Sequence, residues 1–170
     1  ARNIYTEDGS NAFIKLATSN FTSIPTTALG GGNIADRTLI LSWLLGIDVY
    51  DDDGDGSFVD TTNFSGDSIH SRPFVVTYSG TADAPNDVLF TSTNLGTLHA
   101  INPATTGPTA GTELWAYLPK EHQDNLRDYA RPNNTTQHTY GLDGNMTVIT
   151  TEKATSNLDN FALDSVKLYL

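Results

Sequence analysis

Apolar residues recur at helical spacing most clearly in one stretch, "ADRTLILSWLLGID" at 35–48. This spacing predicts an amphipathic helix over about 35–46. Asp36 is placed to cap the start of the helix, and Gly46 marks its expected end. The predicted apolar face consists of Leu39, Trp43 and Leu44, with Ile40 and Ile47 beside it.

After residue 67 the pattern changes to short runs of β-branched and aromatic residues that are separated by turn-rich pieces. Such runs are typical of strands. Four of them within about fifty residues favour an antiparallel meander, the unit of a propeller blade. "HTYGLDGNMTVIT" and "DSVKLYL" are predicted to begin the next unit, and 11–17 is a short strand ahead of the helix. The four predicted strands are 73–78, 87–93, 96–102 and 112–118.

These elements predict a mainly β fold, a partial β-propeller of the first blade or so with a helical lead-in. Residues 1–65 form the predicted lead-in segment, and 66–170 form the start of the propeller. The sequence stops at Leu170 inside an apolar run, and natural domains normally cover such a strand. We therefore expect a fragment of a longer protein, with more propeller beyond this point.

Composition narrows the classes of partner. The net charge is −11 and Lys and Arg do not cluster, which argues against nucleic acid or an anionic membrane as the binding partner. Partners should be cations, neutral sugars or other proteins. The sequence contains no cysteine, so disulfides cannot stabilise the fold, and it has no apolar run long enough to insert into a membrane.

The most concentrated chemistry is the acidic stretch "DDDGDGSFVD" at 51–60. Asp51, Asp53 and Asp55 alternate as do positions 1, 3 and 5 of a calcium loop. Gly56 stands at position 6, where a sharp bend aims the next carbonyl, that of Ser57, at the same point. Hard oxygen ligands without nearby His or Cys favour calcium over zinc or copper.

The second half of this stretch departs from a helix-loop-helix calcium site. Position 12 is Thr62 rather than Glu, and no exit helix is predicted. Asp60 would have to close the coordination shell, together with water or Asp48. Two interpretations remain, a solvated Asp/Gly turn and a calcium site with ligands Asp51, Asp53, Asp55, Ser57 and Asp60, and we favour calcium.

Other residues with reactive side chains give weaker signals. Adjacent residues on an extended chain point to opposite faces, so His70 and Ser71 cannot act as a base and nucleophile pair. His99 lies in an alternating strand and is predicted to be structural, while Trp43 and Trp115 have apolar neighbours that favour core packing over sugar stacking. No catalytic residues are predicted, and the four histidines lack metal-site spacing.

Several ordered motifs resemble the PilC/PilY family of type IV pilus-associated adhesins. "GDSIHSRPFVV" resembles the Gly-Asp-x-x-His-Ser-x-Pro motif that opens that family's propeller, and "GTLHAINPATTGPTAGTELWAYLP" resembles its first-blade pattern. "HTYGLDGNMTV" resembles the following His-x-Tyr-x-Val-Asp-Gly-x-Pro motif, with Met146 in place of Pro. "WLLGIDVYDDDGDG" resembles the Trp-x-x-Gly-x-Asp segment before an acidic loop.

The resemblance covers most of the chain from about Ile34 onward. It implies an extracellular protein at the pilus tip or outer cell surface that supports pilus biogenesis and adhesion. The implied partners are minor pilins and host or surface receptors. Family members known for calcium control carry their loop in a later blade, so the resemblance implies no calcium role for 51–60.

Two alternatives remain open beside a non-enzymatic adhesin. "GTELWAY" also resembles the tryptophan-docking repeat of quinoprotein dehydrogenases, which makes a propeller enzyme the second candidate. A purely structural filament component is the third.

Overall fold

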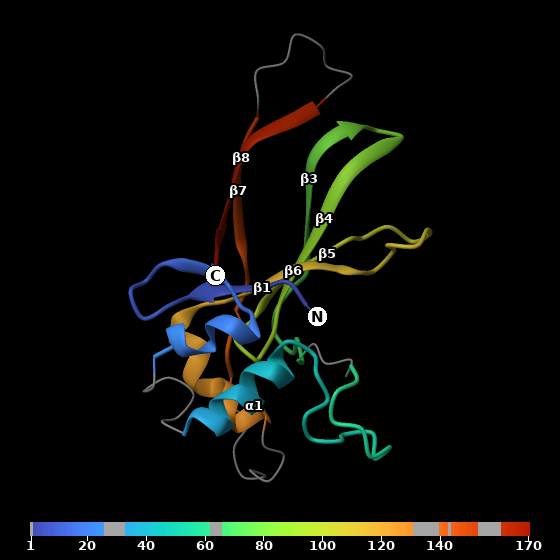
Figure 1. The fold of residues 1–170 in the computed structure, drawn as a ribbon. Coiled ribbons are helices and arrows are strands. Elements are labelled where there is room, and N and C mark those ends of the chain that lie inside the picture. The colour runs from blue at the N-terminus through green and yellow to red at the C-terminus, as the bar shows by residue number, and fades with distance from the viewer. Residues whose placement is uncertain (1, 26–32, 62–65, 131–139, 143, 153–160) are drawn as a thin grey trace.

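The described part of the chain is mainly β with few helices, and its eight strands form one mixed sheet. Figure 1 shows the arrangement of these elements. The described strands follow the order β2-β1-β6-β5-β4-β3-β8-β7 across the sheet. The computed structural model describes residues 2–25, 33–61, 66–130, 140–142, 144–152 and 161–170. The strands are β1 (Ile4–Glu7), β2 (Phe13–Lys15), β3 (Phe74–Thr81), β4 (Ala84–Ser92), β5 (Leu98–Ile101), β6 (Glu113–Leu118), β7 (Thr147–Glu152) and β8 (Phe161–Tyr169). The helices are α1 (Ile34–Leu44), α2 (Leu126–Ala130) and the 3-10 helices η1 (Thr18–Ser23) and η3 (Lys120–Asn125).

The predicted meander is confirmed. Strands β3, β4, β5 and β6 pair in sequence, each antiparallel to the next. The registers place Phe90 of β4 opposite Phe74 on β3 and opposite Ala100 on β5. Apolar side chains of successive strands therefore lie on the same face of the sheet.

The lead-in segment contributes to the same sheet. The short strand expected within 11–17 is confirmed as β2, which pairs antiparallel with β1. Strand β1 was not predicted, and it pairs parallel to β6, with Ile4 opposite Ala116 and Thr6 opposite Leu118. A parallel partner more than 100 residues away leaves no local signal in the sequence.

Strands β7 and β8 come from the two segments that were expected to begin the next unit, and they pair antiparallel as a hairpin. Among the described residues, the hairpin pairs with the edge of β3 at Ser79 with Ala162 and at Gly80 with Phe161. A closed propeller is not seen in the described part of the chain, and the expected separate next unit instead continues this sheet.

Helix α1 matches the predicted helix closely, but its start and its buried face differ from the prediction. The cap is Asn33, whose Oδ1 accepts a hydrogen bond from the backbone N–H of Asp36 at 2.9 Å, so the prediction that Asp36 caps the helix is wrong. Gly46 has a φ of 84° just beyond the helix, as its expected role at the helix end requires. Leu39 is 40% exposed, because the buried face is turned toward Ile40 and its neighbours.

The sheet carries a separate apolar cluster on each face. Neighbouring residues of β6 point to opposite sides, so Ala116 and Leu118 belong to one cluster while Trp115 and Tyr117 pack against the other. The first cluster is covered by α1, α2 and η1. The second packs against the β7–β8 hairpin, which contributes residues such as Val166.

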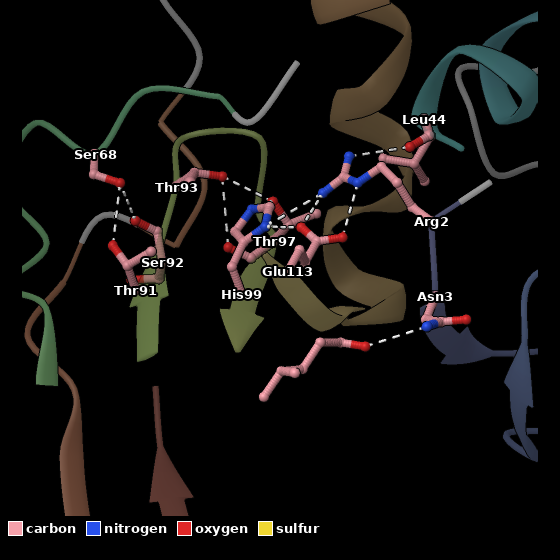
Figure 2. Close-up of polar contacts among 11 residues, drawn as sticks. Arg2, Asn3, Leu44, Ser68, Thr91, Ser92, Thr93, Thr97, His99 and Glu113 are labelled. Carbon is pink, nitrogen blue, oxygen red and sulfur yellow. Dashed lines mark hydrogen bonds and ion pairs between the residues drawn. The ribbon is translucent and has the colours of Figure 1, made fainter. Parts of the chain in front are cut away.

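Arg2 links the start of the chain to both the helix and the sheet (Figure 2). Its guanidinium donates two hydrogen bonds to Glu113 on β6, from Nε to Oε1 at 2.9 Å and from Nη2 to Oε2 at 2.6 Å. Its Nη1 also donates to the carbonyl of Leu44, at the end of α1, at 3.1 Å. The two bonds to Glu113 orient the guanidinium, and the third bond ties the end of α1 to β6 through Arg2.

His99 extends this network into the interior. Its ring is 2% exposed, with Nδ1 at 2.7 Å from Glu113 Oε2 and Nε2 at 2.7 Å from Thr97 Oγ1. The Thr97 hydroxyl is in turn 2.8 Å from that of Thr93, in the turn between β4 and β5 (Figure 2). This setting agrees with the expectation of a structural histidine.

The same contacts set the titration of Glu113. Burial by itself would raise the pKa of this carboxyl, but the hydrogen bonds and charges of His99 and Arg2 outweigh burial and lower the pKa from 4.5 to about 2. The folded state therefore binds this proton more weakly than the unfolded state does. The resulting stabilisation is complete above pH 4.5 and is lost as the pH falls toward 2.

Replacing Glu113 by Gln should remove this contribution, on the order of 3 kcal/mol near neutral pH. We expect the free energy of unfolding, measured in urea at several pH values between 7 and 3, to fall less steeply with acid in Glu113→Gln than in the wild type. Glu152→Gln, at an exposed position of β7, is the matched control and should keep the wild-type slope. Equal slopes for all three proteins would contradict the assigned role of Glu113.

Candidate metal site in the acidic loop

The acidic loop begins where α1 ends, and its two ends are held together. Ile47 and Thr61 form an antiparallel bridge, and the backbone N–H of Asp48 donates to the carbonyl of Asp60 at 3.0 Å. These contacts close residues 48–60 into a loop with a fixed base. The carboxylates of the loop are thereby positioned by the end of the helix.

Asp48 organises the first turn of the loop from inside the protein. Its side chain is 2% exposed, and its Oδ1 and Oδ2 accept from the backbone N–H of Asp52 at 3.0 and 3.1 Å. Sequence reasoning considered Asp48 only as a further metal ligand. The structure gives it a different task, because its carboxylate holds the loop backbone.

The backbone then bends around the side chain of Asp51. Asp51 Oδ1 accepts from the N–H of Gly56 at 2.9 Å, and the Asp51 carbonyl accepts from the N–H of Gly54 at 3.1 Å. Asp51, Gly54 and Gly56 have φ values of 54°, 73° and 84°. Two glycines and an aspartate are residues that tolerate this left-handed region, so the spacing in the sequence has a direct conformational reason.

This bend brings three of the predicted ligands together. Carboxylate oxygens of Asp51, Asp53 and Asp55 all lie within 4.8 Å of one another. Two oxygens bound to one calcium ion lie at most about 5 Å apart, because each bond is about 2.3–2.6 Å long. The separation of these oxygens is compatible with one shared cation. Asp51 is half-buried, and the other two are exposed to solvent.

The remaining predicted ligands lie closer to the base of the loop. The N–H of Ser57 donates to Asp55 Oδ1 at 2.7 Å, which holds Ser57 directly beside the cluster. The carboxylate of Asp60 is outside the group of three. Its Oδ1 is buried, and it has no hydrogen-bond partner among the described residues. Thr62, which replaces the last ligand of a helix-loop-helix site, lies outside the described residues.

The other candidates have structural surroundings. Ser71 is buried, and its Oγ accepts from the backbone N–H and the hydroxyl of Ser92 at 3.2 and 2.8 Å, whereas His70 is exposed. These two residues do not form a base and nucleophile pair. Trp43 is 3% exposed in the first cluster, and Trp115 packs against Phe90 with ring centroids 5.8 Å apart.

Comparisons with known proteins do not assign the chain to a family. No protein-family model matches the chain, and neither curated proteins nor solved structures include a significant match. The resemblance to pilus-associated adhesins thus stays a prediction from motifs. Within the described residues, no helix is long and apolar enough to cross a membrane.

Substituting Gly56 by Ala should strain the bend that gathers the carboxylates. A Cβ at Gly56 would meet nothing within 4 Å, so its cost comes from the positive φ and should be about 1–2 kcal/mol. Gly144→Ala is the control, because Gly144 also has open space but no positive φ. We expect urea unfolding to show a loss of stability in Gly56→Ala only; equal losses would contradict the described backbone.

Proposed function

We propose that residues 48–60 form a calcium-binding loop in which Asp51, Asp53 and Asp55 supply the first ligands. The observation that carries this proposal is the approach of their oxygens to within 4.8 Å on a loop whose base is fixed. Like charges held this close repel one another. A divalent cation between them turns that repulsion into attraction.

The coordination shell would be completed from the same loop. Calcium takes six to eight oxygens in irregular arrangements, so the carbonyl of Ser57, the carboxylate of Asp60 and water are suitable further ligands. The buried Oδ1 of Asp60, which has no hydrogen-bond partner among the described residues, supports its participation after a local rearrangement. The absence of sulfur or imidazole ligands in the loop favours calcium over zinc or copper.

A bound ion would act at the junction between the helix and the sheet. The loop starts at the end of α1, and Arg2 connects that end to Glu113 of the sheet. Calcium would therefore stabilise the loop against the rest of the protein rather than support a reaction. The proposed role is structural binding, in a protein that is not an enzyme.

Calorimetry at pH 7 should show saturable calcium uptake with a dissociation constant on the order of 10⁻⁴ to 10⁻³ M, because the loop is open to solvent and has few charged ligands. Calcium at about 100 times this constant should add about 2.7 kcal/mol to the stability, and a chelator should reverse the gain. Absence of both heat and stabilisation at calcium concentrations up to about 100 times this constant would refute the proposal.

Asp53→Asn is the sharpest variant for this test. An Asn side chain can still accept from the N–H of Asp55, as Asp53 Oδ1 does at 3.2 Å, so the turn is kept while one charge is lost. We expect at least a tenfold weaker affinity. Asp83→Asn, at an exposed position between β3 and β4, is the charge-matched control and should bind calcium like the wild type.

The wider proposal is a pilus-associated adhesin at the outer cell surface, with minor pilins and surface receptors as partners. Support comes from the ordered motifs in the sequence, together with the antiparallel pairing of the segments that carry them. A propeller enzyme of the quinoprotein type and a structural filament component remain the alternatives.

Antibodies raised against this chain should detect the protein in the sheared pilus fraction of the source cells, and removal of the protein should reduce piliation and attachment. Detection in the cytoplasm alone would contradict the proposal. Dye-linked dehydrogenase turnover by the full-length protein would favour the enzyme instead. Normal attachment in cells lacking the protein, combined with altered filaments, would favour the structural component.

A further inference from the structure

A cavity of about 350 Å³ that is open to solvent lies between the sheet and β8, on the face opposite α1. Its floor includes Trp115 and Tyr117 of β6, and Val166 and Leu168 of β8 form the facing wall. Most of its surface is apolar. The volume lies within the range of about 300–1,000 Å³ that is typical of small-molecule sites.

Aromatic rings form most of the sheet side of this cavity. Tyr78 and Phe13 line it together with Trp115 and Tyr117. Contacts outside the cavity hold several of these rings in place, since Phe13 stacks on Tyr5 at 5.4 Å between centroids and Trp115 packs against Phe90. Fixed aromatic faces of this kind favour a flat apolar ligand, because aromatic pairs gain stability from stacked and edge-on contact.

The two tyrosine hydroxyls in the cavity differ in one respect. The hydroxyl of Tyr117 donates its hydrogen bond to Glu7 Oε1, so it is not available to a ligand as a donor. The hydroxyl of Tyr78 has no hydrogen-bond partner within the described residues, and it is not among the buried unpaired atoms, so water can reach it. Burial raises the pKa of Tyr78 above its usual value, so this group remains a donor at physiological pH.

We propose that this cavity binds a small aromatic molecule that carries one hydrogen-bond acceptor. The aromatic walls would hold the rings, and the Tyr78 hydroxyl would donate to the acceptor. The volume of about 350 Å³ leaves room for two fused rings with a short substituent. This site is separate from the acidic loop and does not depend on the calcium proposal.

Two probes test the proposal, 2-acetylnaphthalene, which carries a carbonyl acceptor, and 2-ethylnaphthalene, which has a similar shape without one. The indole N–H signals in a ¹H–¹⁵N spectrum report the location of binding. Trp115 lines the cavity, whereas Trp43 is 3% exposed in the other cluster and serves as an internal reference. We expect the Trp115 signal to shift with either probe and the Trp43 signal to stay in place.

Affinities from the same titrations should favour 2-acetylnaphthalene roughly fivefold, the effect of one added hydrogen bond. Tyr78→Phe removes only the unpaired hydroxyl and should abolish this preference, while Tyr117→Phe should keep it because Tyr117 already donates to Glu7. The proposal is overturned if neither probe shifts the Trp115 signal up to its solubility limit, if both indole signals shift alike, or if Tyr78→Phe keeps the full preference.

Discussion

The half-buried ion pair between Arg2 and Glu113 is the interaction on which the rest of the arrangement depends. It joins residues 111 positions apart, and Arg2 also reaches the last turn of α1 through the carbonyl of Leu44. The side chains are 17% and 22% exposed, and His99 shares the same carboxylate oxygen. Loss of either charge would leave the other partly desolvated without compensation, which is the costly way to break such a pair.

The acidic loop follows the helix end that Arg2 holds against the sheet. Because the helix end is fixed, the bridge between Ile47 and Thr61 and the buried carboxylate of Asp48 hold the base of the loop in one place. The exposed carboxylates can then approach one another only through the bend around Asp51. The aromatic cavity has a different origin, since it arises where the β7–β8 hairpin passes over the opposite face of the sheet.

Local pattern was sufficient to predict the helix, the meander and the Asp51, Asp53 and Asp55 cluster, because strand alternation and loop spacing are encoded over a few neighbouring residues. Local pattern did not predict the contacts that depend on residues far apart in the sequence. The pairing of β1 with β6 and the contacts of Arg2 left no signature in the sequence. The closing role of Asp60 stays a prediction, because its carboxylate lies outside the group of three.

The parallel pairing of β1 with β6 also bears on the order of events during protein synthesis. Residues 4–6 leave the ribosome more than 100 residues before their partners at 116–118. Until then the first strand lacks its parallel neighbour, and closing so long a loop carries an entropic cost that slows folding. During this interval the nascent chain carries an unpaired, partly apolar segment that is prone to aggregate. A chaperone would protect the chain most at this stage.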